Sequence, residues 1–284
     1  MTKAEENTDG GKPGNKGGWL EAFAWICSVV AFSPALVWLY KNLMQSQQLR
    51  DAMIILVCAG MVMAIESDIR PHRPVFTKAS FLWLAIAYVL LVLGGFLGMW
   101  GVFLTLFGLS AVLVSAGLAF FDRPRYVYAV GGAFYSFTML SLFMPLFDFP
   151  LRVFAGKLSQ YILGFFNDTV LLLLMKGEAP QIALKVNDST FLVATECNGF
   201  GIISSCVVLS IITVLFRKIS WLKRLALVVA SVILAYLANT LRIVSIVTLA
   251  PHVGEGNYNF MHESLGYFFF ALGLIAVWKL CRKL

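Results

Sequence analysis

Charged residues are scarce in this sequence: only 13% of its 284 residues are Asp, Glu, Lys or Arg. By contrast, 60% are hydrophobic and the mean hydropathy is +0.82. These values lie far outside the range of soluble globular domains. The composition therefore excludes a soluble enzyme and predicts a polytopic membrane protein. The net charge of +7 comes from Lys and Arg in short loops, so nucleic acid is not an expected partner.

Cysteine is also scarce and forms no paired motif. The five cysteines stand at positions 27, 58, 197, 206 and 281 without a CxxC pair, and four of them fall within or against apolar segments. Disulfides and zinc sites are not expected from this pattern. No metal or other cofactor is predicted.

The start of the chain lacks the apolar core of a signal peptide. Residues 1–18 are polar and rich in Gly. They predict a disordered cytoplasmic tail rather than a cleaved leader.

Apolar segments of membrane-spanning length follow one another along the rest of the chain. About 20 apolar residues cross the hydrocarbon core of a bilayer as a helix. We therefore predict an all-α polytopic fold with about eight transmembrane helices. The apolar runs cover residues 19–40, 52–65, 81–97, 100–121, 126–147, 198–216, 222–249 and 263–280.

Residues 148–197 form the sizeable segment between these runs. Its first part carries apolar and polar residues on opposite helical faces, which predicts an interfacial helix lying on the bilayer, with Arg152 on its polar face. Farther on, TVLLLLM, IALKV and TFLVATE read as short strands, and a polar turn at 187–189 predicts a small β-hairpin cap. The alternation in residues 182–186 also motivates the prediction that the cap strands accept an extended segment of the substrate as an added strand.

Lysine and arginine are concentrated in alternate connections, at residues 70–78, 123–125, 217–224 and 279–283. The positive-inside rule assigns these loops to the cytoplasm. The remaining connections are then extracytoplasmic, which places Cys197 and His262 at the outer ends of their helices. Arg242 lies about 20 residues, or about 30 Å of helical rise, from the inner start of its helix, so it reaches the same boundary.

Cys197 stands where an apolar helix begins, within Thr-Glu-Cys-Asn-Gly-Phe-Gly. A helix N-terminus favours the thiolate that attacks carbonyl groups, whereas the neighbouring Glu196 disfavours it. Gly199 and Gly201 would let a substrate backbone approach closely. These features predict a nucleophilic thiol, and a small buried apolar residue is the alternative interpretation.

Arg242 is the single charged residue in the apolar stretch 225–249. Because burying a charge at membrane depth costs about 3 kcal/mol or more, we expect it to face the bundle interior. There its fork of donors would stabilise an oxyanion or bind a carboxylate. An arginine that extends to the lipid phosphates is the alternative. Asn239 lies on the same helical face and would orient Arg242 or the substrate.

His262 is expected to open the last helix, where the helix dipole disfavours imidazolium and leaves a neutral base. A neutral imidazole beside a cysteine generates and later reprotonates its leaving group. His252, in the same outer loop, is the second candidate, and an ordinary interfacial role is open for either histidine. Glu196 and Glu263 are expected to cap helix starts.

Three short motifs resemble those of the exosortase/archaeosortase family of multi-pass membrane cysteine transpeptidases. Cys-Asn-Gly at 197–199 is similar to the family's Cys-x-Gly, with Asn198 in place of its Ser or Ala. Asn-Thr-Leu-Arg at 239–242 is similar to its Asn-x-x-Arg, and His262 with Gly266 to its final helix. The similarity covers about residues 145–280. It implies Cys197 as nucleophile, His262 as acid and base, and Arg242 as the stabiliser of the transition state.

The resemblance also implies partners and a location. Family members process exported proteins that carry a C-terminal motif, a membrane helix and a basic tail, here at the outer face of a bacterial inner membrane. Residues 19–284 would then form a single membrane domain, with N-terminal helices in 19–147 and a catalytic half in 148–284 whose cap is 148–196. The alternative is a non-enzymatic transporter or assembly factor for an exported polymer, in which Arg242 lines an anion path.

Overall fold

The computed structural model describes residues 18–166, 169–175, 181–187, 189–193 and 197–283. Residues 1–17 of the predicted tail and Glu196 lie outside the described residues. The first helices are α1 (Gly18–Ala31), α2 (Ser33–Gln45), α3 (Gln47–Glu66), α4 (Lys78–Phe96), the 3-10 turn η1 (Gly98–Trp100) and α5 (Gly101–Phe120). The later ones are α6 (Pro124–Leu163), α7 (Phe200–Phe216), α8 (Trp221–Leu249), the 3-10 turn η3 (Ala250–His252) and α9 (Glu255–Arg282).

Helices long and apolar enough to cross a bilayer dominate the described chain. Six helices, α3, α4, α5, α6, α8 and α9, meet this description on their own. The pair α1 and α2, bent by 61°, is together long enough for a seventh span, and α7 is a shorter apolar helix of 17 residues. The prediction of an all-α polytopic membrane protein with about eight membrane helices is confirmed.

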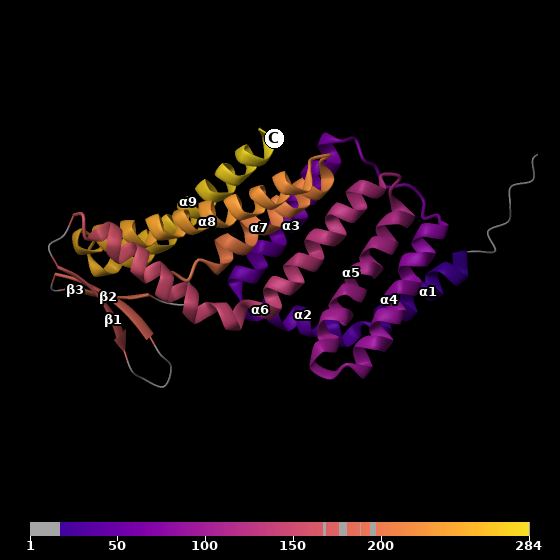
Figure 1. The fold of residues 1–284 in the computed structure, drawn as a ribbon, viewed down its shortest axis with the longest axis horizontal. Coiled ribbons are helices and arrows are strands. Elements are labelled where there is room, and N and C mark those ends of the chain that lie inside the picture. Colours follow the sequence, from indigo (N-terminus) through magenta and orange to yellow (C-terminus); the bar gives the residue numbers. More distant parts are fainter. Residues whose placement is uncertain (1–17, 167–168, 176–180, 188, 194–196, 284) are drawn as a thin grey trace, which may run out of the picture.

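Residues 148–163 continue α6 instead of forming a separate helix. Figure 1 shows α6 changing direction near its middle, where Pro145 and Pro150 lie inside the helix. Proline removes a backbone hydrogen bond and its ring clashes with the preceding turn, which bends a helix. Beyond the bend, Phe154 and Tyr161 are 60% and 68% exposed. Such outward aromatic rings suit a membrane interface.

Three strands form an antiparallel sheet in the order β1 (Val170–Met175), β2 (Gln181–Val186) and β3 (Ser189–Val193). The predicted hairpin is the pair of β2 and β3, and β1 adds a third strand. Residues 182–186, which motivated the prediction of an added strand, cannot pair with one themselves, because β2 is central and paired on both sides. Among the residues that the structure describes, the unpaired edges of this sheet belong to β1 and β3.

Figure 1 shows an elongated bundle with the sheet at one end and α4 and α5 at the other. The main core joins α3, α6, α7, α8 and α9 with the inner face of the sheet. Helix α7 packs against α3, α6, α8 and α9, and nearly all of its residues are buried. Cys197 lies three residues before the start of this central helix, next to the sheet.

The basic loops meet one another at the end of the bundle away from Cys197. Arg282 at the end of α9 pairs with Glu66 at the end of α3, at 3.1 Å. Arg217, just past α7, donates a hydrogen bond of 2.7 Å to the carbonyl oxygen of Cys281. Because α7 has 17 residues, its two ends are separated by about 25 Å. The molecule therefore has one end rich in Lys and Arg and another that holds Cys197.

Candidate active site

The thiol of Cys197 lies beside the imidazole of His262, with 3.8 Å between Sγ and Nε2. The thiol-bearing residue is 7% exposed, and His262 is half-buried. The two residues come from different elements, the segment before α7 and helix α9. An imidazole in contact with a thiol can take its proton and later return it.

His262 does not open the last helix, as the sequence predicted. Helix α9 begins at Glu255, so His262 lies about two turns inside it, beyond the reach of the helix-end charge. Glu263 is likewise too far along α9 to cap it, so that prediction is also wrong. The rival His252 lies in η3, is exposed, and lines neither of the two spaces that border His262.

Asn239 of α8 fixes the backbone beside the thiol. Its Nδ2 donates a hydrogen bond of 2.9 Å to the carbonyl oxygen of Cys197. Gly199, the N-cap of α7, has φ of +81°, and a Cβ on it would lie 2.7 Å from Nδ2 of Asn239. Glycine is therefore needed here for the backbone conformation and for the approach of Asn239. The group that approaches Gly199 closely is therefore the side chain of Asn239 and not the substrate backbone that the sequence suggested.

Asn198 joins three parts of the fold through its fully buried side chain. Its Nδ2 donates a hydrogen bond of 2.6 Å to Oδ1 of Asp148, which lies at the bend of α6. Its Oδ1 accepts hydrogen bonds from the Phe200 backbone at 2.7 Å and from Nε2 of Gln48 at 3.4 Å. Arg152 pairs with Asp148 at 2.6 Å, and its side chain is only 13% exposed. The prediction of Arg152 on an outer polar face is therefore wrong.

Asp148 and Gln48 belong to this network but were not identified from the sequence. Asp148 carries a signal that points to it: an acidic residue between two phenylalanines, four residues before Arg152. An acidic residue in apolar membrane sequence needs a partner, and this spacing supplies one on the same helical face. Gln48 gives no comparable signal, because its contact with Asn198 joins residues 150 positions apart.

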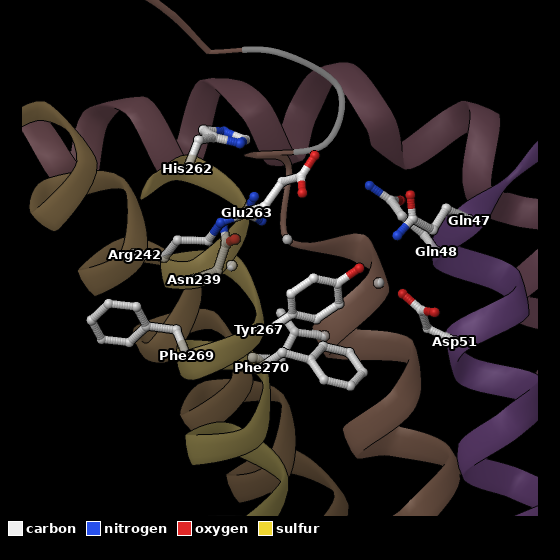
Figure 2. A pocket seen from close by; sticks show the side chains of 14 residues that line it. Gln47, Gln48, Asp51, Asn239, Arg242, His262, Glu263, Tyr267, Phe269 and Phe270 are labelled. Atoms are coloured by element: carbon white, nitrogen blue, oxygen red, sulfur yellow. The ribbon is translucent and has the colours of Figure 1, made fainter. Parts of the chain in front are cut away.

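Arg242 lies between α8 and α9, with its guanidinium packed over Gly266. A Cβ on Gly266 would lie 3.1 Å from Nη2 and 3.3 Å from Cζ of Arg242. Next to it, a cleft of about 340 Å³ separates α3 from α9. Figure 2 shows the side chains of α3 and α9 on opposite sides of this cleft. Its polar lining consists of Gln47, Gln48, Asp51, Asn239, Arg242, His262, Glu263 and Tyr267.

A second, narrow space of about 30 Å³ borders the thiol on the side of the sheet. Its walls are apolar residues of β2, β3 and α8, together with Cys197, Tyr258 and His262. Because His262 borders both spaces, its ring stands between the polar cleft of Arg242 and the apolar space of Cys197. Among the described residues, no three His, Cys, Asp or Glu side chains gather as metal ligands would.

Together these features define a multi-pass helical membrane protein with a thiol, an imidazole and a guanidinium at one end of its bundle. Residues 66–279 match the family described as transmembrane exosortase (Exosortase_EpsH), and the chain belongs to this family. The resemblance seen in the motifs is thereby confirmed, and the match also takes in α4, α5 and all of α6. No curated protein and no solved structure gives a significant match.

Proposed function

We propose that this exosortase is a membrane-embedded cysteine protease or transpeptidase that cleaves the C-terminal sorting signals of exported proteins. The observation that carries the proposal is the contact of 3.8 Å between Sγ of Cys197 and Nε2 of His262. Family membership supports the same class of reaction. The polar cleft beside His262 supplies Arg242 as a cationic donor.

The reaction begins when the Cys197 thiolate attacks the scissile carbonyl carbon, forming a C–S bond and moving the carbonyl electron pair onto oxygen. Arg242 donates hydrogen bonds to this oxyanion. The oxyanion then collapses, the C–N bond breaks, and His262 gives its proton to the departing amine. A thioester joins the sorted protein to Cys197.

A nucleophile completes the cycle by attacking the thioester carbonyl. His262 takes the proton of this nucleophile, and Cys197 leaves as a thiolate. An amine or hydroxyl acceptor gives transpeptidation, and water gives proteolysis. In either case the enzyme returns to its starting state without a cofactor.

The proposed location is the inner membrane of a bacterium, with the site facing away from the cytoplasm. The loops rich in Lys and Arg lie at the other end of the bundle from Cys197, and such loops remain cytoplasmic. The proposed partners are exported proteins that carry a motif, a membrane helix and a basic tail.

Co-expression with a candidate protein bearing such a signal tests the proposal, with the size of that protein followed by immunoblot. We expect cleavage with the wild type and with His252→Ala, and none with Cys197→Ala, Arg242→Ala or His262→Ala. Trapping of a covalent adduct at Cys197, released by hydroxylamine, identifies the thioester. Normal processing by Cys197→Ala would contradict Cys197 as the nucleophile. Normal function of Cys197→Ala in cells, with no processing of such a protein by the wild type, would favour a transporter or assembly factor.

A further inference from the structure

Strand β3 has a free main-chain edge. Among the described residues it pairs only with β2, and β2 is occupied on its other side by β1. An exposed strand edge presents alternating N–H and C=O groups that another extended chain can pair with. The edge of β3 is therefore a place where a peptide main chain can bind.

The outward main-chain groups of β3 belong to Thr190 and Leu192. The N–H of Asn187 donates a hydrogen bond of 3.0 Å to the carbonyl of Thr169, so odd-numbered residues of β2 face β1. By alternation, even-numbered residues of β2 face β3. Their partners in the register are Ser189, Phe191 and Val193. The residues between these partners turn their N–H and C=O groups away from the sheet.

This edge faces a hollow that adjoins the narrow space beside the thiol. A space of about 470 Å³ lies between β3 and the segment 250–258, and Thr190 and Pro251 line its two sides. Phe191 and Tyr258 border this hollow and also the narrow space beside Cys197. The main-chain edge and the candidate nucleophile therefore border two adjoining spaces that share Phe191 and Tyr258 as lining.

We propose that the free edge of β3 binds the extended segment of the substrate polypeptide as a fourth strand and delivers its scissile bond to Cys197. The proposal rests on the proposed function, because it names how the same site holds its substrate. A polypeptide main chain is the ligand whose donors and acceptors alternate at the spacing of a strand edge. Binding of this kind uses the substrate backbone and leaves side-chain selectivity to the flanking spaces.

Proline substitutions at the two edges of the sheet test the proposal in the full-length protein. Leu192→Pro removes an outward N–H of β3, and Leu174→Pro makes the matched change on the outer edge of β1, where Leu174 is 63% exposed. We expect Leu192→Pro to slow substrate cleavage by about tenfold or more, since backbone hydrogen bonds and strand contact are lost together, with Leu174→Pro close to wild type. Equal rates for both variants would overturn the proposal.

Disulfide cross-linking reports substrate binding without requiring cleavage. It also does not depend on whether the Leu192→Pro variant folds. Thr190→Cys is placed in the Cys197→Ser protein and paired with single cysteines scanned along the substrate segment that precedes its membrane helix. We expect cross-links at every second substrate position, because side chains alternate across a strand. Cross-links without this alternation, no cross-links at all, or equal cross-linking from Leu174→Cys would refute the edge as the binding site.

The two experiments separate this proposal from the proposed function. If the wild type cleaves its substrate but the alternating cross-links are absent, the edge proposal alone fails. If alternating cross-links form but the wild type cleaves nothing, the edge binds a peptide and the proposed chemistry is wrong.

Discussion

Asp148 and Asn198 are joined by a hydrogen bond of 2.6 Å between Oδ1 and Nδ2, although 50 residues separate them. This bond ties the bend of α6 to the residue that follows Cys197. Through its other oxygen, Asp148 also neutralises Arg152, whose side chain is largely buried. One carboxylate thus supports the backbone of the candidate nucleophile and the charge balance of α6.

Replacing Asp148 by Ala is expected to destabilise the protein by about 3 kcal/mol, because it removes the partner of a largely buried cation and the acceptor of Asn198. Cleavage should fall together with stability. Thermal unfolding in detergent and the co-expression assay measure the two effects. Asp122→Ala is the matched control, since Asp122 contacts His72 at 3.1 Å while its side chain is 89% exposed. We expect the control variant to lose at most about 1 kcal/mol of stability. An equal loss of stability in both variants would contradict the structural role of Asp148.

Gly199→Ala is expected to abolish most of the activity while the helices remain folded. Alanine at a left-handed φ costs about 1–2 kcal/mol, and its Cβ would displace Asn239 from the carbonyl of Cys197. The measurement is the rate of substrate cleavage at matched protein levels. Gly95→Ala is the control, because a Cβ at Gly95 meets no atom within 4 Å. Wild-type activity in Gly199→Ala would show that the contact with Asn239 is dispensable.

Gly266→Ala is expected to move the guanidinium of Arg242, since a Cβ would lie 3.1 Å from Nη2. The arginine stem is flexible, so we expect a partial loss of cleavage of about fivefold rather than unfolding, as for a displaced transition-state donor. Gly256→Ala, in the first turn of α9, is the control because its surroundings are open. A loss of stability in place of a loss of rate would instead point to a packing role for Gly266.

The reaction of Cys197 with a maleimide reports directly on its partnership with His262. We expect His262→Ala to slow alkylation of Cys197 at neutral pH by about tenfold or more, because the ring removes the thiol proton. Mass spectrometry of the peptide that holds Cys197 separates this thiol from the other four cysteines. His252→Ala should react like the wild type. Unchanged alkylation in His262→Ala would argue against an activating imidazole.

Much of the fold follows from patterns along the chain. Apolar runs of membrane length predicted the helices, and the polar turn near Asn187 predicted the hairpin of β2 and β3. The continuity of α6 through Pro145 and Pro150 was not predicted, because flanking helices and packing allow a bent helix to continue where local preference favours a break. The last helix begins earlier than its apolar run predicts, since residues 255–259 are mostly polar and give little apolar signal.

The sequence by itself determined that this is a membrane protein and roughly where its chain crosses the bilayer. It also determined which residue types could carry its chemistry. Hydrophobicity and loop charge are local properties, so they can be read one segment at a time. Only the tertiary structure decided that Sγ of Cys197 contacts Nε2 of His262 and that Asn198 donates a hydrogen bond to Asp148. These contacts join residues 65 and 50 positions apart, and they depend on how bent helices pack around α7, which no local pattern encodes.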